Sequence, residues 1–180
     1  MKKIFKYIFA GMAAMSVVAC SEDALETSPS SSVSGNELLG TATNALVSLN
    51  GVYRAMYTAG VSNSSNTHQC FGITAYNLVA DVMGEDCIMN GQGSGWFWYD
   101  CVYNVKSRYT STGWRSYDMW NGYYTWISNV NYILAEEETM SGSETEKNYV
   151  LGQAYAVRAY SYFMLAQMFS STYKEHESEP

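Results

Sequence analysis

Two long stretches in the second half of the chain carry apolar residues at helical spacing, and a short polar segment separates them. The first starts near Ser116, and its stripe is Trp120, Tyr124, Ile127, Asn131 and Leu134, widened by Tyr123, Trp126 and Val130. The second runs from about Glu144 to Phe169, and its stripe is Leu151, Tyr155, Arg158, Tyr162, Leu165 and Phe169. Because the Ser141-Gly142 turn between them is short, the two helices are predicted to pack as an antiparallel hairpin.

The ends of this hairpin are marked by local signals. Ser143 and Glu146 have the spacing of a capping box, which predicts the start of the second helix. Glu136, Glu137 and Glu138 close the first helix, although carboxylates at a helix C-terminus oppose the macrodipole. The first helix is therefore expected to fray near Ala135, with the three glutamates in solvent.

Two further helices are predicted in the first half of the chain. Ser34 and Glu37 form another capping-box pattern, and a helix is expected from Ser34 to about Tyr57. Its core-facing residues are expected to be Leu38, Ala42, Ala45, Leu49, Val52 and Met56. A second helix is expected over 73–83, ended by Gly84, with Ile73, Tyr76, Val79 and Ala80 on one side. The Ser- and Asn-rich segment 60–69 reads as a loop.

Between residues 84 and 112 the helical periodicity fails. Glycines alternate at 91, 93 and 95, and Trp96-Phe97-Trp98-Tyr99 follow directly. This is not a phosphate-binding loop, because no strand precedes it and no helix pattern follows the glycines. The chain has only two prolines and no regular alternation of polar and apolar residues. We therefore predict an all-α fold interrupted by one long aromatic loop.

The N-terminus has the layout of a secretory leader. The basic start contains Lys2, Lys3 and Lys6. The apolar run from Ile4 to Val18, interrupted by single polar residues, has about fifteen residues, fewer than the roughly 20 that a membrane-spanning helix requires. Val17-Val18-Ala19-Cys20 resembles the lipobox of bacterial lipoproteins, which implies cleavage before Cys20 and diacylation of its thiol. An ordinary leader with an incidental cysteine is the alternative. The predicted organisation is a signal peptide over 1–19, a lipidated Cys20 with a Ser-rich tether over 20–34, and a helical domain over 35–180.

Charge and cysteine content limit the classes of partner. Without the three leader lysines, 7 basic residues stand against 17 acidic ones, a net charge near −10. Such a chain has no electrostatic reason to bind nucleic acid or anionic lipid headgroups. Besides Cys20 there are Cys70, Cys87 and Cys101, so at most one disulfide can form among these three, and the sequence does not select the pair. No CxxC-type spacing supports a metal site, and no cofactor is expected.

The hairpin also resembles a known family. Its sequence carries Trp120-x-x-Tyr123-Tyr124-x-x-Ile127-x-x-Val130-Asn131-x-Ile133-Leu134, followed by Gly152-Gln153-Ala154-x-x-x-Arg158-Ala159-Tyr160-x-Tyr162-Phe163-x-Leu165. These strings resemble the SusD/RagB family, and Ala159-x-x-x-Phe163 also fits a tetratricopeptide repeat. The resemblance implies a SusD-like helical scaffold with tetratricopeptide-repeat-like hairpins, anchored by lipid in the outer membrane and facing the exterior. It also implies glycan binding beside a SusC-like TonB-dependent transporter that receives the oligosaccharide.

The chain departs from the family pattern in two ways. Ser170-Ser171 follow the last helix where family members usually have a glycine, and family members are commonly several times longer. We therefore expect the chain to be the N-terminal portion of such a protein. An incomplete helical array exposes apolar faces, so the stability of these residues alone is expected to be low.

Candidate ligand-binding residues lie in the aromatic loop. Aromatic rings bind sugars by stacking on their apolar C–H faces, and Trp96, Trp98 and Tyr99 have no helical spacing that assigns them to a core. A sugar platform and a loop folded onto its own aromatic cluster both remain open. Asp100, Asn104 and Arg108 could supply hydrogen bonds to sugar hydroxyls. For Trp120, Tyr124 and Trp126 the helical spacing favours core packing over ligand binding.

Other residues are assigned structural roles. Arg158 on the hairpin is interpreted as pairing with a carboxylate or with helix carbonyls. Asp81, Glu85 and Asp86 could hold Ca²⁺, but they lack EF-hand spacing, so solvated acids are preferred.

No catalytic motif supports an enzyme. The two histidines, His68 and His176, belong to no H-E-x-x-H motif, and no G-x-S-x-G elbow occurs. The predicted function is a glycan-binding lipoprotein. A helical scaffold without sugar binding is the alternative, and a lipid-anchored glycoside hydrolase is a third hypothesis.

Overall fold

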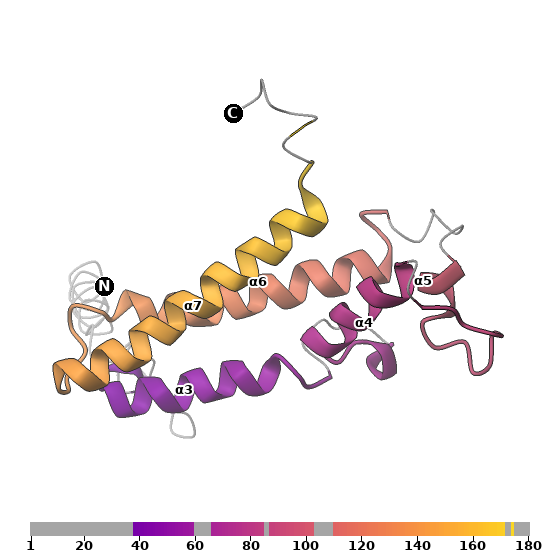
Figure 1. The fold of residues 1–180 in the computed structure, drawn as a ribbon. Coiled ribbons are helices and arrows are strands. Elements are labelled where there is room, and N and C mark those ends of the chain that lie inside the picture. Colours follow the sequence, from indigo (N-terminus) through magenta and orange to yellow (C-terminus); the bar gives the residue numbers. More distant parts are fainter. Residues whose placement is uncertain (1–37, 60–65, 85–86, 103–109, 172–173, 175–180) are drawn as a thin grey trace, which may run out of the picture. The chain divides into compact units, whose positions relative to one another are not determined.

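The computed structural model describes residues 38–59, 66–84, 87–102, 110–171 and 174, all within the compact unit 36–180. In chain order the elements are α3 (Ala42–Ala55), the short 3₁₀ helix η2 (Thr67–Gln69), α4 (Ile73–Met83), α5 (Trp98–Val102), α6 (Trp114–Ala135) and α7 (Glu144–Phe169) (Figure 1). The described residues contain five α-helices and no strand, as expected for an all-α fold. None of these helices is long and apolar enough to cross a membrane. The predicted leader, Cys20 and tether lie outside the described residues.

The predicted hairpin is formed by α6 and α7, which run side by side in Figure 1 and make the most extensive contact between elements. The bounds of α7 are those predicted, and α6 begins two residues earlier than expected, at Trp114. The last turn of α6 ends at Ala135, and Glu137 and Glu138 are exposed, as predicted. One of these glutamates has a partner, because Tyr155 Oη donates to Glu137 Oε2 at 2.6 Å.

The N-terminus of α7 is closed by the predicted capping box. Glu146 N donates to Ser143 Oγ at 3.3 Å, and Ser143 N donates to Glu146 Oε2 at 3.0 Å. The side-chain and backbone hydrogen bonds from Ser143 lower the pKa of Glu146 below its usual value. The carboxylate therefore favours the folded state when ionised, and this contribution is lost as pH falls through the lowered pKa.

Ser143→Ala should lower the free energy of unfolding by about 1 kcal/mol at neutral pH, because the cap hydrogen bond is lost. The penalty should shrink when the pH is lowered from neutral to below the lowered pKa of Glu146, because protonation weakens the wild-type capping box. Urea denaturation of both chains at the two pH values measures the difference. A penalty that does not change with pH would contradict the role of the Glu146 carboxylate.

Helix α3 packs against both helices of the hairpin. Thr41 caps it by accepting from Asn44 N at 3.1 Å, and Tyr53 Oη donates to Gln153 Oε1 of α7 at 3.0 Å. The predicted helix is interrupted: Leu38 and Leu39 are helical, the chain bends at Gly40, and α3 begins at Ala42. The predicted start at Ser34, with its partner Glu37, lies outside the described residues. At the bend the backbone groups bond to the hairpin turn instead of to a continuous helix. Ser141 N donates to Gly40 O at 2.9 Å, and Ala42 N donates to Ser141 O at 2.9 Å. These two hydrogen bonds hold the start of α3 against the turn of the hairpin.

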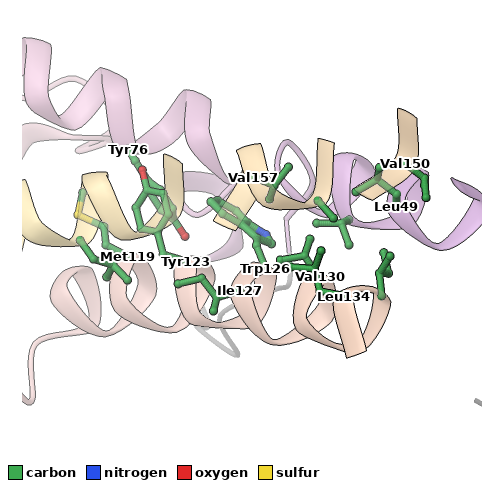
Figure 2. Packing of buried hydrophobic residues seen from close by; sticks show 14 of the residues in the cluster. Leu49, Tyr76, Met119, Tyr123, Trp126, Ile127, Val130, Leu134, Val150 and Val157 are labelled. Carbon is green, nitrogen blue, oxygen red and sulfur yellow. The ribbon is translucent and has the colours of Figure 1, made fainter. Parts of the chain in front are cut away.

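The core lies where α3, α4, α6 and α7 meet. Figure 2 shows Tyr76, Tyr123 and Trp126 at its centre, with Val130, Leu134, Val150 and Leu49 continuing it along the hairpin. Tyr123 and Trp126 pack edge-to-face at 5.0 Å between ring centroids, and both are 0 % exposed. Burial raises the pKa of the Tyr123 hydroxyl, so it stays protonated throughout the ordinary pH range.

Three residues of each predicted hairpin stripe were placed on the wrong side. Trp120, Tyr124 and Asn131 on α6 are exposed, and so are Tyr155, Tyr162 and Phe169 on α7. The buried residues of α7 are instead Val150, Leu151, Ala154, Val157, Ser161 and Leu165. The prediction that Trp126 packs in the core was confirmed, but the same prediction for Trp120 and Tyr124 was wrong. Large aromatic residues occur all round both helices, so aromatic spacing alone could not distinguish the two faces.

The bounds of α4 and its termination at Gly84 were predicted correctly. Ala75, Tyr76, Val79 and Val82 are buried, whereas Ala80, which was placed on the core side, is exposed. Gly72 sets the angle of entry: its φ is +73°, and a Cβ atom there would lie 2.1 Å from Met56 O. This close approach lets Ile73 N donate to Met56 O at 2.8 Å, which fixes α4 to the end of α3.

Candidate functional site

The aromatic loop leads into a short helix that the sequence did not predict. Helix α5 spans only Trp98–Val102, and two glycines with positive φ, Gly93 and Gly95, form the turns ahead of it. Phe97 has a φ of +55°, a conformation that non-glycine residues seldom adopt. Its side chain is buried, and it packs edge-to-face on Phe71 at 6.2 Å between ring centroids. Phe97 is therefore the residue that fastens the loop to the core.

A buried ion pair holds α5 against the start of α6. Arg115 Nη2 lies 2.9 Å from Asp100 Oδ2, and Arg115 Nε donates to Asp100 Oδ1 at 3.3 Å. The two residues are 2 % and 4 % exposed, respectively. The guanidinium lies over the Trp114 ring at 4.2 Å and the Phe97 ring at 5.2 Å from their centroids. Two-point pairing and aromatic contacts together give the cation one defined orientation.

Gln69 connects the same arginine to the loop. Arg115 Nη1 donates to the backbone oxygen of Gln69 at 2.8 Å. The side-chain Oε1 of Gln69 accepts from Phe97 N at 2.8 Å, and its Nε2 lies 2.9 Å from His68 Nε2. Segments 66–72, 96–102 and the first turn of α6 are thus joined by hydrogen bonds through Gln69 and Arg115.

On the outer side of this network, the ring of Trp96 is presented to solvent. Trp96 is 51 % exposed and contacts His68 at 5.1 Å between ring centroids, with an interplanar angle of 41°. Tyr99 is 39 % exposed, and Trp98 is half-buried. The loop therefore combines both arrangements considered from the sequence: Phe97 folds inward, while Trp96 remains outside. The backbone next to Trp96 is held by the hydrogen bond from Phe97 N to Gln69 Oε1, and the indole itself contacts His68.

The remaining predicted site residues have different environments. The Asp100 carboxylate is buried in the ion pair with Arg115, so it supports the loop from below. Asn104 and Arg108 lie outside the described residues. The sequence did not indicate His68, Gln69, Phe97 or Arg115 as partners of the aromatic loop. Gln69 lies 46 positions before Arg115 and Asp100 lies 15 before it, so no local spacing could reveal these contacts.

Arg158 has a structural role of the kind predicted, with a different partner. Its Nη1 donates to Asn131 Oδ1 of α6 at 3.0 Å, and its guanidinium lies 4.9 Å from the centroid of the Tyr155 ring. The expected carboxylate or helix carbonyl is thus replaced by a side-chain amide. Arg158 links the two helices of the hairpin.

Two hollows lie beside the first turns of α6. One, of about 380 Å³, is lined by residues of α4, α6 and α7 that include Met83, Met119 and Met168. The other, of about 340 Å³, is bordered by Tyr117, Trp120 and Phe169. Their walls are mainly apolar, and neither includes any of the aromatic residues 96–99.

The described residues offer little for catalysis or metal binding. No group of three or more His, Cys, Asp or Glu side chains among them could hold a metal ion. No disulfide joins the cysteines that the structure describes, Cys70, Cys87 and Cys101. Glu85 and Asp86, for which solvation was preferred over Ca²⁺ binding, lie outside the described residues. What the loop presents is an exposed aromatic surface, which is suited to binding.

Comparison with known proteins assigns the chain to a family. A SusD-like family model, described as "Starch-binding associating with outer membrane", matches residues 25–180. The comparisons with curated proteins and with solved structures found no match. The match covers the hairpin, the aromatic loop and all the described helices, and the family description names binding and a membrane location. The chain therefore belongs to the SusD-like family of starch-binding proteins associated with the outer membrane.

Proposed function

We propose that this protein is a surface-exposed lipoprotein that binds oligosaccharide and acts with a SusC-like TonB-dependent transporter in nutrient uptake. The family description supports starch binding and association with the outer membrane. The leader and Val17-Val18-Ala19-Cys20 support attachment by acyl chains on Cys20. One observation carries the binding role: Trp96 is half exposed on a loop whose underside is held by a buried ion pair.

The physical basis of the proposal is pre-organisation. A sugar ring presents an apolar C–H face, and an indole carried on a backbone that is already held in place loses less conformational entropy when it stacks on that face. Trp96 is the proposed platform, and Trp98 and Tyr99 extend it. Asn104 and Arg108 are proposed to donate hydrogen bonds to sugar hydroxyls. Asp100 is proposed to act indirectly, by holding Arg115 and with it the loop.

Affinity electrophoresis in gels containing starch or other polysaccharides tests the binding role. The native chain should be retarded in at least one glycan, and Trp96→Ala/Trp98→Ala should migrate as in the glycan-free gel. The matched control is Trp120→Ala, because Trp120 is 46 % exposed on α6 and does not belong to the loop. Equal retardation of the native chain and the double variant would overturn the assignment of the loop.

The same gels distinguish the alternative functions. Absence of retardation in every glycan would favour a helical scaffold lipoprotein that binds no sugar. Release of reducing sugar from the gel polysaccharide would instead indicate a glycoside hydrolase. No particular glycan is assigned, because the described contacts involve ring stacking and leave the hydroxyl pattern of the ligand undefined.

Cys20→Ser should abolish incorporation of radiolabelled palmitate and release the protein from the membrane fraction. The reason is that the thiol of Cys20 is the proposed acyl acceptor, and an acidic chain has no basic patch to hold it on lipid. Metabolic labelling followed by fractionation measures both effects. Cys87→Ser is the control, because Cys87 is exposed and lies far from the leader in sequence. Full labelling of Cys20→Ser would contradict the proposed anchor.

The transporter partnership is tested by recovery of the complex from outer membranes. A tagged chain extracted in mild detergent should carry with it a protein of the TonB-dependent class, identified by mass spectrometry. The exposed loop variant Trp96→Ala should retain that partner, because it alters the proposed sugar contact alone. Recovery of the chain without any such transporter, under conditions that preserve a known transporter complex, would contradict the partnership.

A further inference from the structure

The side-chain amide of Gln69 has two hydrogen-bond partners, and one of them fixes its orientation. Its Oε1 accepts from Phe97 N at 2.8 Å, and its Nε2 lies 2.9 Å from His68 Nε2. A backbone N–H group can only donate, so the atom that faces Phe97 N must be the amide oxygen. The amide nitrogen of Gln69, which can only donate, is therefore turned towards the histidine.

This orientation determines which ring nitrogen of His68 carries the proton. A neutral imidazole donates from one nitrogen and accepts at the other. Because Gln69 donates to His68 Nε2, that nitrogen is the acceptor, and the proton lies on Nδ1. His68 is exposed, so its Nδ1–H group is left to solvent. The contact thus requires the neutral ring in one of its two tautomers.

A protonated imidazole cannot make this contact, because both of its nitrogens donate. With the Gln69 amide as it stands, two N–H groups would face each other at 2.9 Å. If the amide turned over, its nitrogen would face Phe97 N instead, and the same conflict would arise in the loop. Gln69 is buried, so water does not readily replace the lost hydrogen bond, and a buried donor without an acceptor is costly.

The loop is sensitive to this hydrogen bond because its backbone is strained. Phe97 has a φ of +55°, and such a conformation persists only where surrounding contacts hold it. The hydrogen bond from Phe97 N to Gln69 is one of these contacts, and the packing of the Phe97 ring on Phe71 is another. Trp96 comes directly before Phe97, and its ring contacts His68 at 5.1 Å between centroids. Both the backbone beside Trp96 and its indole therefore depend on the pair of His68 and Gln69.

We infer that neutral His68, with its proton on Nδ1, acts through Gln69 to position the loop that carries Trp96, and that protonation of His68 loosens this loop. Histidine changes charge between about pH 5 and pH 8, so the loop is held at the upper end of this range and loosened at the lower end. The consequence for ligand binding rests on the proposed function: with Trp96 as the sugar platform, glycan affinity falls as the pH falls. His68 and Gln69 are positioning residues, and neither needs to touch the sugar.

Other titratable and charged groups surround this contact. Cys70 follows Gln69 in the chain, Tyr99 and Asp100 lie on α5, and Arg115 lies on α6. Arg115 is paired with Asp100 at 2.9 Å and also donates to Gln69 O at 2.8 Å. Substitutions at His68 leave all four groups in place, so a pH dependence that disappears with His68 belongs to its imidazole.

The position of the proton is tested by NMR on the full chain in mild detergent, labelled with ¹⁵N in its two histidines, His68 and His176. At about pH 7.5, long-range ¹H–¹⁵N spectra should show the proton of His68 on Nδ1, whereas an unconstrained neutral histidine carries it mainly on Nε2. The signals that disappear in His68→Gln are those of His68. A proton on Nε2 of His68 at this pH would overturn the inference.

Hydrogen exchange of the Phe97 amide measures how firmly the loop is held. Its protection, corrected for the intrinsic exchange rate at each pH, should be at least about threefold lower at about pH 5 than at about pH 7.5. In His68→Gln the new amide oxygen accepts from Gln69 without titrating, so protection should be high at both pH values. In His68→Phe a ring beside Trp96 is kept but the acceptor is lost, so protection should be low at both. Equal protection of the native chain at the two pH values, or a pH dependence that persists in His68→Gln, would contradict the inference.

Isothermal titration with a starch-derived oligosaccharide at the same two pH values connects the loop to the ligand. The native chain should bind at least about threefold more weakly at the lower pH, and His68→Gln should bind equally at both. His68 is exposed, so its substitutions should leave the fold intact, which circular dichroism checks. Equal affinity of the native chain at both pH values would refute the control by His68. Absence of binding at either pH would instead refute the proposed function, while the NMR and exchange measurements would still decide whether His68 positions the loop.

Discussion

Arg115→Leu should lower the free energy of unfolding by about 3–5 kcal/mol, because it leaves the Asp100 carboxylate buried without its partner. The same substitution removes the hydrogen bond to Gln69 O and the cation–π contacts with Trp114 and Phe97. Urea denaturation of the chain without its leader, followed by circular dichroism, measures the loss. It is a large fraction of the 5–15 kcal/mol that stabilises a typical domain.

A double-mutant cycle separates the ion pair from the general cost of altering a buried site. Asp100→Leu alone should be similarly destabilising, because it strands the guanidinium. Arg115→Leu/Asp100→Leu should cost clearly less than the sum of the single variants, since neither charge is then left alone. Arg54 lies exposed on α3, so Arg54→Leu is the control for replacing an arginine on a helix without disturbing a buried ion pair. If the losses in the free energy of unfolding from the two single variants simply add in the double variant, Arg115 and Asp100 do not interact, which would contradict the buried ion pair.

Trp126→Ala should also cost about 3–5 kcal/mol, because it removes the largest fully buried side chain of the core. Its ring lies 5.0 Å from Tyr123 and 6.0 Å from Tyr76 between centroids, so the cavity opens where α4 and α6 meet (Figure 2). Thermal unfolding monitored by circular dichroism should show a correspondingly lower Tm.

Trp120→Ala is the matched control for this prediction, because it is the same substitution on the same helix. Trp120 is 46 % exposed, and its contacts are with Tyr124 and Phe169 at the surface. Its loss should be about 1 kcal/mol or less. Equal destabilisation by the two substitutions would mean that both faces of α6 are buried. That result would contradict the packing in which Trp126 is buried and Trp120 is exposed.

Much of the helical fold could be predicted from local signals. The capping box of Ser143 and Glu146 located the start of α7, and Gly84 located the end of α4. These predictions succeeded because caps act over three or four residues and do not depend on tertiary contacts. It was harder to predict which sides of α6 and α7 face the core. Exposed positions such as Tyr155 and Tyr162 carry the same residue type as the buried Tyr123.

The candidate site was only partly visible in the sequence. The glycine run and the aromatic residues marked the loop, but α5 has five residues and depends on the ion pair with Arg115 for its position. An isolated helix of this length is unstable, so local propensity could not reveal it. The roles of Gln69 and Phe97 arise from a hydrogen bond between residues 28 positions apart. Only the folded chain brings these groups together.

The exposed ring of Trp96 is the proposed sugar-binding surface. Isothermal titration with a starch-derived oligosaccharide tests it most directly, with Trp96→Ala and Trp120→Ala compared in the same chain. We expect Trp96→Ala to weaken binding at least about tenfold, which corresponds to about 1.4 kcal/mol, and Trp120→Ala to bind as the native chain does. Unchanged affinity in Trp96→Ala, with the fold intact, would contradict sugar binding at this ring.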